Sequence, residues 1–271
     1  MKIWLNGKFI NEEEAKANIL DPGFLYGQGV FETMRAYSAD VFRLDSHIER
    51  LFNALTLVNI KSDIKPELLK KAVRQSLKEN GLKDAYLRLT AWQGIEKVNI
   101  AILARSYDFF KEMDYRKGFK AIISKTFRQN ESSPLAKIKS SNCLHLLLAY
   151  QEARRNNADE ALLLDTRGFL AEASRANIFI VKDNSLLTPS LDCGCLAGIT
   201  RDTVLALTRG KKLRAVEAKI NREDLEKADE AFLTNSLIEI MPLVWIDGRP
   251  IKKGRPGPIT ELLLEGYRSL L

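Results

Sequence analysis

The sequence contains few of the residues that build disulfide frameworks or metal clusters. Among its 271 residues are three cysteines, Cys143, Cys193 and Cys195, and two histidines, His47 and His145. A sparse and odd number of cysteines argues against a disulfide framework. The two later cysteines form a single C-x-C pair without a second pair at zinc spacing, so we expect no metal site. This usage predicts a reduced, cytoplasmic protein.

Long hydrophobic runs are also missing. No stretch reaches about 18 uninterrupted apolar residues, so we expect no transmembrane helix. The first residues, MKIWLNGKFINEEEAK, become acidic within a short distance and lack the apolar run of a signal peptide. The composition, with 45% hydrophobic and 28% charged residues, is typical of a globular protein with a sizeable core.

Acidic residues are outnumbered, and the formal net charge is +7. Such a charge suits either a polyanion such as nucleic acid or a lysine-rich solvated surface. The basic residues are scattered along the chain and are not interleaved with aromatic residues, which favours the solvated surface. We therefore expect no nucleic-acid partner, whereas a small anionic substrate fits the same charge.

The hydrophobic pattern alternates between strand and helix periodicity. KIWLNGKFI predicts a hairpin around Asn6-Gly7, because this dipeptide is typical of type I′ turns. Turns are also expected at Arg167-Gly168 and Asp183-Asn184. Further strands are expected within 23–44, 85–92, 98–104, 119–127, 160–189 and 232–242, and helices at 45–60, 65–81, 142–157 and 198–210.

Capping and facing residues refine the helix predictions. Asp45 or Ser46 is expected to cap the helix at 45–60, with His47 on its surface. The helix at 65–81 is expected to begin near a proline and to end before Gly81, and that at 198–210 to end at Gly210. Leu144, Leu147 and Leu148 are expected to form the apolar face of the helix at 142–157.

Strands and helices are mixed on both sides of one polar, irregular segment. This pattern predicts an α+β protein of two domains. We expect an N-terminal α+β domain at 1–108, a linker at 109–115, and a larger C-terminal domain at 116–271.

Two lysines in AKIKSSN, Lys137 and Lys139, lie where a strand is expected to give way to a helix. Such junctions often face clefts, although a lysine there is more often a surface charge than a catalytic group. The two lysines are expected on the same face of a strand, so periodicity does not choose between them.

Two further motifs offer sites for anions. LAGITRDTV places Ile199 and Thr200 at a helix N-terminus, where backbone N–H groups and a hydroxyl can bind an anion or simply start the helix. FLTNSLIEIMP places the polar turn Asn235-Ser236 after a strand, either as a donor to phosphate or carboxylate or as an ordinary connection.

One carboxylate falls inside an apolar strand pattern. Glu172 in LAEASRANIF needs a partner, because burying an isolated charge is costly. The sequence offers two partners, either the nearby Arg175 or a cationic ligand.

The order of these motifs is more specific than any one of them. LYGQGVFETMRAY, RLDSHIERL, AYLRL, IKSSN, ADEALLLDTRGFLAEASRANIFIVKD, LLTPSLDCGCLAGITRD and ADEAFLTNSLIEIMPL follow one another over nearly the whole chain. In this order they resemble the class IV, or fold-type IV, pyridoxal-phosphate enzymes. That family includes branched-chain aminotransferases, D-amino-acid aminotransferases and 4-amino-4-deoxychorismate lyases.

The resemblance implies a fold, a cofactor and a set of ligands. The fold is a two-domain α+β enzyme with a smaller N-terminal α/β domain and a larger C-terminal domain that has a barrel-like β core. The cofactor is pyridoxal 5'-phosphate, in the cleft between the domains, and Lys139 carries it as a Schiff base. Glu172 lies at its pyridine nitrogen, while its phosphate and the substrate carboxylate are bound by Arg50, Ile199, Thr200, Asn235 and Ser236.

Within the family the motifs divide. AYLRL matches the branched-chain aminotransferases, with Tyr86 and Arg88 facing the substrate. Thr33 and the TNSL turn look more like the lyases, and Cys143 replaces a common tyrosine of branched-chain enzymes. The chain lacks both the R-x-H segment of D-amino-acid enzymes and the glycine-rich, arginine-bearing loop of lyases.

We therefore predict an aminotransferase that moves an amino group from a hydrophobic or branched-chain amino acid to a 2-oxo acid such as 2-oxoglutarate. A 4-amino-4-deoxychorismate lyase is the alternative, and a D-amino-acid aminotransferase is less favoured. The resemblance also implies a homodimer in which a partner loop closes the pocket. The residues it places around the substrate are Tyr26, Phe31, Thr33, Arg35, Tyr86, Arg88 and Leu237.

Overall fold

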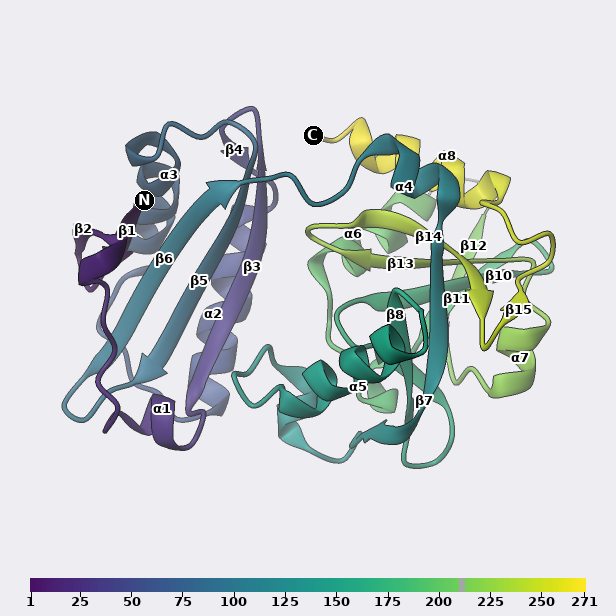
Figure 1. Cartoon of the computed structure of the whole chain (residues 1–271), viewed down its shortest axis with the longest axis horizontal. Helices are drawn as coiled ribbons and strands as arrows, with labels where there is room; N and C mark the ends of the chain where they lie inside the picture. The colour runs from purple at the N-terminus through teal and green to yellow at the C-terminus, as the bar shows by residue number, and fades with distance from the viewer. Residues whose placement is uncertain (210–212) are drawn as a thin grey trace. The chain divides into compact units, whose positions relative to one another are not determined.

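The structure is a computed structural model that describes residues 1–209 and 213–271 (Figure 1). The chain divides into two compact units. The first unit consists of Met1–Phe109 and Ile138–Asn142, and the second of Phe110–Lys137 and Cys143–Leu271.

The first unit is built around a six-stranded antiparallel sheet in the order β2-β1-β6-β5-β3-β4. Its elements are β1 (Lys2–Leu5), β2 (Lys8–Asn11), η1 (Glu12–Glu14), α1 (Pro22–Leu25), β3 (Gly29–Tyr37), β4 (Asp40–Val41), α2 (Leu44–Leu57), α3 (Pro66–Glu79), β5 (Ala85–Gln93) and β6 (Val98–Ser106).

The hairpin β1-β2 confirms the turn predicted from its dipeptide. Asn6 and Gly7 both have positive φ, 49° and 96°, as a type I′ turn requires. Asparagine tolerates this conformation better than most residues, and glycine adopts it without a steric penalty.

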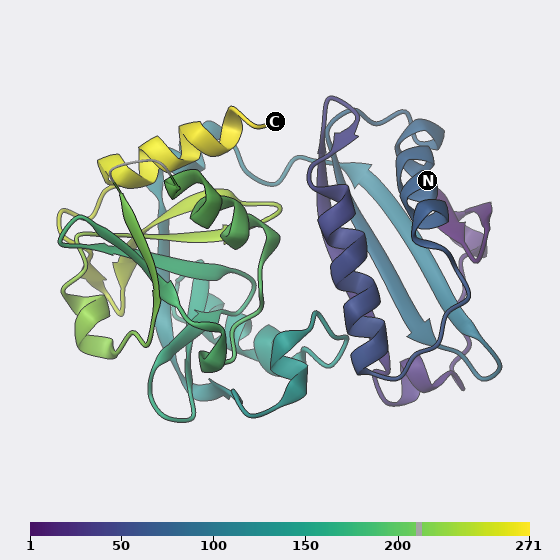
Figure 2. The same cartoon turned by 180° about the vertical axis from the view of Figure 1, so that it is seen from behind.

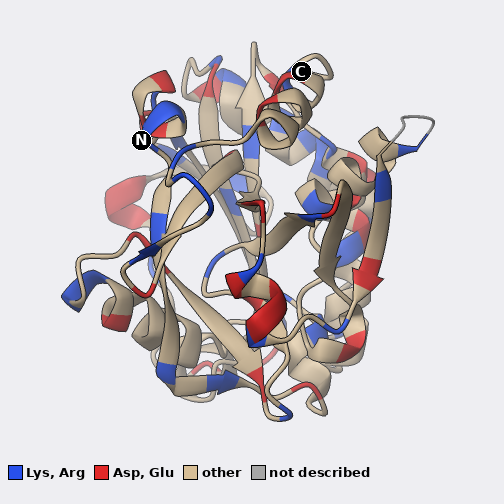
Figure 3. Cartoon of the chain, turned by 90° about the vertical axis from the view of Figure 1, so that its right-hand side faces the viewer, with Lys and Arg blue, Asp and Glu red and all other residues tan. Residues whose placement is uncertain are grey.

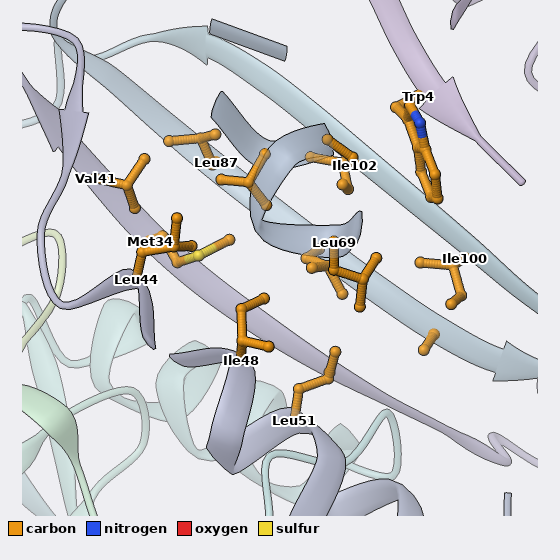
Figure 4. Packing of buried hydrophobic residues seen from close by; sticks show 14 of the residues in the cluster. Trp4, Met34, Val41, Leu44, Ile48, Leu51, Leu69, Leu87, Ile100 and Ile102 are labelled. Atoms are coloured by element: carbon orange, nitrogen blue, oxygen red, sulfur yellow. The ribbon is translucent and has the colours of Figure 1, made fainter. Parts of the chain in front are cut away.

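Helices α2 and α3 cover one face of this sheet (Figure 2). Strand β3 directs Val30, Met34 and Ala36 toward them, and β5 directs Leu87 and Leu89, all fully buried. Figure 4 shows Met34 and Leu87 within this packing. Full burial of one such leucine contributes roughly 2 kcal/mol of hydrophobic stabilisation. This alternation leaves the other residues of β3 and β5 on the opposite face of the sheet.

The N-terminus of α2 corrects a prediction. The helix begins at Leu44, and the residue before it, Arg43, has a left-handed backbone with φ 55°. Neither Asp45 nor Ser46 is therefore the capping residue, because both already lie within the first turn. Asp45 instead forms an ion pair with Lys70 of α3, at 2.6 Å.

Residues 138–142 belong to the first unit, although the sequence placed them in the C-terminal domain. They run along the edge of β3, where Val30 and Ser140 form an antiparallel bridge. Phe31 N–H donates to the Lys139 carbonyl at 2.9 Å, and Ser141 N–H donates to the Gly29 carbonyl at 2.9 Å. These long-range backbone bonds decide the membership of the segment, and no local pattern indicates them.

The second unit contains a nine-stranded mixed sheet. Its elements are α4 (Glu112–Lys117), β7 (Phe119–Gln129), η2 (Pro134–Lys137), α5 (Leu144–Arg155), β8 (Glu160–Asp165), β9 (Leu170–Ala173), β10 (Asn177–Lys182), β11 (Ser185–Pro189), η3 (Leu191–Cys193), α6 (Ile199–Thr208), β12 (Arg214–Ala218), α7 (Arg222–Glu226), β13 (Glu230–Asn235), β14 (Glu239–Ile246), β15 (Arg249–Pro250) and α8 (Pro258–Arg268).

This larger sheet curls into a barrel-like core. The strand order is β12-β11-β10-β13-β14-β7-β8-β9, with β15 paired to β14, and the terminal strand β9 also packs against β10 and β11. Phe179 of β10 and Phe232 of β13 are fully buried and stack on each other, with ring centroids 5.0 Å apart. Helix α5 packs on β7 and β8, while α6 and α8 pack on β13. The fold predicted from the resemblance is confirmed.

Two predictions about this unit are wrong. Leu144 and Leu147 of α5 are 63% and 48% exposed, and the buried face of the helix is formed by Ala149 and Ala153. The segment 109–115, expected to be irregular, contains the start of α4, whose Tyr115 is buried.

The remaining predictions on helix ends are mixed in outcome. Helix α3 begins at Pro66, and Gly81 follows its end with φ 62°, as predicted. Helix α6 runs to Thr208, whereas Gly210, its predicted end, lies outside the described residues. Among the described helices we find none with the length and apolar character needed to cross a membrane.

Candidate active site

Lys139 lies beside the beginning of β3 in the first unit. Its side chain is half-buried, with Nζ 4.7 Å from the centroid of the Phe31 ring. Lys137, in contrast, is exposed, ends the short helix η2 and belongs to the second unit. The two lysines therefore do not share one strand face, and only Lys139 lies against this sheet.

Five of the predicted substrate residues share the sheet face that α2 and α3 leave uncovered. In the register of β3 with β5, Thr33 lies opposite Arg88 and Arg35 lies opposite Tyr86. The Arg88 guanidinium lies 3.8 Å from the centroid of the Phe31 ring. The structure thus brings together these five residues, which are Phe31, Thr33, Arg35, Tyr86 and Arg88.

Cation–π contacts orient the arginines of this face. The guanidinium of Arg35 lies 3.6 Å from the ring centroid of Tyr107 and 4.3 Å from that of Tyr37. Tyr26, also a predicted substrate residue, is different: it follows α1 and is 74% exposed.

Arg50 is held by a buried carboxylate that the sequence analysis missed. Glu32 of β3 is 1% exposed and accepts two bonds from Arg50, from Nε at 2.8 Å and from an Nη at 2.7 Å. His47 Nδ1 lies 2.7 Å from the same carboxylate. His47 is buried, so its predicted place on the helix surface is wrong.

The environment of this cluster shifts two ionisations. Burial alone would raise the pKa of Glu32, but Arg50 and then His47 outweigh it and lower the pKa from 4.5 to about 2. Burial lowers the pKa of His47 despite the nearby carboxylate. The sequence does carry a signal for Glu32, because it shares the inward period of Val30 and Met34.

Glu172 is one of the buried carboxylates of the second unit. It lies on β9, is 6% exposed, and accepts from Gln129 Nε2 at 3.0 Å and from Leu196 N–H at 3.0 Å. Arg175, one of the two partners predicted for Glu172, pairs instead with Glu160, at 3.3 Å. Gln129 and Leu196 were not among the predicted site residues.

The N-terminus of α6 supplies donors for an anion. Gly198 precedes the helix and has no side chain to cap it, and the first turn contains Ile199 and the buried Thr200. The first N–H groups of a helix have no carbonyl partner within it, and the helix dipole favours negative charge there. A Cβ at Gly198 would lie only 1.9 Å from Asn177 Oδ1, so glycine is needed for this close approach.

The turn after β13 is ordered by its own asparagine. Asn235 Oδ1 accepts from the backbone N–H groups of Leu237 and Ile238, at 2.8 and 2.9 Å. Asn235 Nδ2 donates to the Arg175 carbonyl at 2.9 Å. The side chain of Asn235 therefore shapes the turn, which presents the partly exposed Ser236 and Leu237.

All three cysteines are free. Cys143 precedes α5, and Cys193 and Cys195 are buried in the loop between β11 and α6. Burial, with the charge of Glu172 as a second cause, raises the pKa of Cys195 to about 12. A thiol in this state is a poor nucleophile.

Basic and acidic residues are interspersed along the elements of both units (Figure 3). The polar groups described above differ between the two units. The first unit provides a lysine and a partly buried arginine, and the second provides a buried carboxylate and a helix N-terminus.

Comparison with known proteins decides the family. Residues 29–246 match the model of the family described as amino-transferase class IV. The chain belongs to this family.

Individual relatives extend over the whole chain. A branched-chain-amino-acid aminotransferase of Pseudomonas aeruginosa is 36% identical over 99% of this chain and 92% of its own length. The crystal structure of a branched-chain aminotransferase from Thermoproteus uzoniensis with norvaline has a TM-score of 0.92 at 36% identity, covering 100% of this chain and 94% of the other. The crystal structure of another branched-chain amino acid aminotransferase, with pyridoxamine 5'-phosphate, has a TM-score of 0.94 at 33% identity, covering 99% and 93%.

Membership confirms the resemblance inferred from the motif order. The roles of individual residues, which the resemblance implies one by one, remain predictions.

Proposed function

We propose that this class IV aminotransferase transfers an amino group from a branched-chain amino acid to a 2-oxo acid such as 2-oxoglutarate. The observation that carries the proposal is the match, over 99% of the chain, to an enzyme named as a branched-chain-amino-acid aminotransferase. The departures at Thr33 and Cys143 are local in comparison and are compatible with an altered pocket in the same enzyme class.

The residues of the chain fit pyridoxal 5'-phosphate as cofactor. We propose that Lys139 binds it covalently and that Glu172 binds its ring nitrogen. Its phosphate suits the guanidinium of Arg50 and the N-terminus of α6 at Ile199 and Thr200, because both groups favour anions. The turn at Asn235 and Ser236 is proposed to complete the set of phosphate and carboxylate donors.

Glu172 suits its proposed role because it is anchored from two sides. Gln129 and Leu196 N–H each bind one carboxylate oxygen, which fixes the plane of the group. A fixed carboxylate at the ring nitrogen favours the protonated ring. When bound, the cofactor supplies an electron sink for negative charge at the substrate's α-carbon.

Lys139 is proposed to serve a second role as a base. With the cofactor bound, Lys139 Nζ would hold the proton that leaves the substrate's α-carbon. Its backbone is fixed by the bond from Phe31 N–H, and the Phe31 ring lies under Nζ. These contacts limit the positions from which the amine can reach a proton.

The uncovered sheet face is proposed to bind the substrate side chain and carboxylate. Phe31 and Tyr86 provide apolar surface for a branched side chain, and Arg88 and Arg35 provide positive charge. Tyr26 and Leu237 are proposed to contribute at the margin of the pocket.

A homodimer is proposed for the protein in solution. The segment around α1 exposes Ile19, Leu20, Phe24 and Tyr26, each by more than 60%. A contiguous apolar segment of this kind marks an interaction surface in soluble proteins. Family membership supports a second copy of the chain as the occupant, and a fully active monomer in sedimentation experiments would contradict this part.

Two further assignments stay proposals. The cysteine usage supports a cytoplasmic location, and the two compact units support a division of the chain into two domains.

A product assay tests the proposed reaction. The purified protein is to be offered branched-chain amino acids with 2-oxoglutarate and, separately, 4-amino-4-deoxychorismate. We expect glutamate from the first mixture, whereas pyruvate and 4-aminobenzoate from the second would identify the lyase instead.

A further inference from the structure

Gln129 has an unusual set of contacts for a glutamine at the end of a strand. It is the last residue of β7 and is only 4% exposed. Its Nε2 donates to Glu172 Oε1 at 3.0 Å and to the Gly194 carbonyl at 2.9 Å. Its Oε1 lies 3.2 Å from His145 Nε2. All polar atoms of this buried side chain are therefore engaged.

These contacts fix the orientation of the amide. A carboxylate and a carbonyl only accept hydrogen bonds, so the amide nitrogen must face Glu172 and Gly194. The amide oxygen of Gln129 only accepts hydrogen bonds. The hydrogen in its contact with His145 therefore lies on His145 Nε2, which is the donor. A flipped amide would place three acceptors together, and one arrangement is thus strongly favoured.

The same amide fixes a loop. Gly194 has φ +80°, and a Cβ there would lie 2.8 Å from Glu131 Cα and 3.1 Å from Gln129 Cγ. The loop continues to Leu196, whose N–H binds the second oxygen of Glu172, and then to the N-terminus of α6. Gln129 therefore ties Glu172 to the backbone that precedes Ile199 and Thr200.

We propose that Gln129 is a positioning residue for Glu172, holding its carboxylate in the orientation that meets the cofactor's ring nitrogen. This inference rests on the proposed function, because it assigns Glu172 to that nitrogen. The amide suits the task since it holds a carboxylate without adding a charge of its own. A lysine at this position would bring a competing cation against the same oxygen.

The test measures the ring nitrogen as well as the rate. Wild type, Gln129→Met, Glu172→Gln and the double variant are reconstituted with ring-¹⁵N-labelled cofactor. For Gln129→Met we expect the ¹⁵N shift to move toward that of the unprotonated ring. We also expect single-turnover transamination to slow by about 10- to 100-fold, as is usual when a supporting side chain is lost.

The double variant distinguishes a positioning role of Gln129 from general damage to the fold. In the Glu172→Gln background the further change Gln129→Met should have little effect on rate or ¹⁵N shift, because the carboxylate it positions is already absent. Gln151→Met, at an exposed glutamine of α5, is the matched control and should resemble wild type. An unchanged ¹⁵N shift in Gln129→Met, or equal losses in both backgrounds, would overturn the proposal.

Two further results separate failure of the Gln129 proposal from failure of the proposed function. If Gln129→Met does not fold, Gln129→Asn retains an amide that is one methylene too short, and it should show the same direction of ¹⁵N shift. Wild-type protein that neither binds the cofactor nor transfers nitrogen would contradict the proposed function itself. If wild-type protein is active but the Gln129 variants show neither the change in ¹⁵N shift nor the slower single-turnover rate, only the proposed role of Gln129 is contradicted.

Discussion

Each unit of the chain contains a buried glutamate in an apolar strand, and the two are held differently. Glu32 in the first unit is 1% exposed and is bound by the guanidinium of Arg50 and by His47. Glu172 in the second unit is 6% exposed and is bound by the neutral amide of Gln129 and by the Leu196 N–H. Both residues are buried glutamates, so their hydrogen-bond donors distinguish their roles.

The donors explain the difference physically. A guanidinium that forms two bonds balances the charge of Glu32, which makes this carboxylate part of a structural ion pair that orients Arg50. Neutral amides orient Glu172 but carry no net charge. The comparison predicts that one glutamate serves stability and anion binding, whereas the other serves the chemical step.

The largest effect is expected for substitution of Lys139, which should remove activity almost completely. Lys139→Ala should abolish the visible absorbance of bound cofactor and nearly all turnover, because the covalent attachment and the base are both removed. Absorbance spectra and steady-state rates measure this. Lys137→Ala is the matched control and should leave both nearly intact, and the reverse pattern would show that the wrong lysine had been chosen.

Glu32→Gln is expected to have the next largest effect. Glu32→Gln breaks a buried ion pair, because the amide keeps one acceptor for Arg50 but removes the negative charge and the second acceptor, and this costs about 3–5 kcal/mol of unfolding free energy. A mispositioned Arg50 should also weaken binding of pyridoxal 5'-phosphate more than binding of pyridoxal, which lacks the phosphate. Denaturant unfolding and equilibrium binding of both compounds test this, and equal losses for the two compounds would argue against a role at the phosphate.

Acidic pH should weaken the ion pair between Glu32 and Arg50. Because the pKa of Glu32 falls from 4.5 to about 2 on folding, its contribution is complete above pH 4.5 and is lost as pH falls toward 2. The loss at pH 3 should reach about 2 kcal/mol. The lowered pKa of His47 adds a loss below pH 6.5, since protonation favours the unfolded chain. Unfolding free energies measured at pH 7, 5 and 3 should fall less steeply for Glu32→Gln than for wild type.

Much of this arrangement could be predicted from local sequence. The Asn6-Gly7 turn, the strands β5 and β6 and the helix α3 follow from backbone preference and periodicity, which act over a few residues. The order of the motifs along the chain also indicated the family, because an ordered series of motifs is more specific than any single motif.

The supporting contacts could not be predicted in the same way. Gln129 lies beyond an irregularity in the pairing of β7 with β8, where the register shifts between Ile123 and Arg128, and local sequence does not indicate such a shift. The buried face of α5 was misjudged because periodicity finds an apolar stripe but not the side that a sheet covers. Such facts depend on contacts between residues far apart in the chain.

The smallest effect is expected at an exposed glutamate. Glu223 on α7 forms an i,i+4 ion pair with Lys227 at the surface. Glu223→Gln should leave the unfolding free energy nearly unchanged, because solvent screens such pairs. A clear loss of stability in denaturant unfolding would mean that Glu→Gln changes are costly regardless of burial, and it would weaken the comparison.

The most direct measurement places Glu172→Gln beside Glu32→Gln and records cofactor content, melting temperature and single-turnover rate for each. Glu172→Gln should keep its cofactor and lose only about 1 kcal/mol of stability, since an amide still accepts one of the two bonds. Its rate should fall by about 100-fold or more, because the charge that favours the protonated ring is gone. A wild-type single-turnover rate in Glu172→Gln, accompanied by a large fall in melting temperature, would contradict the account.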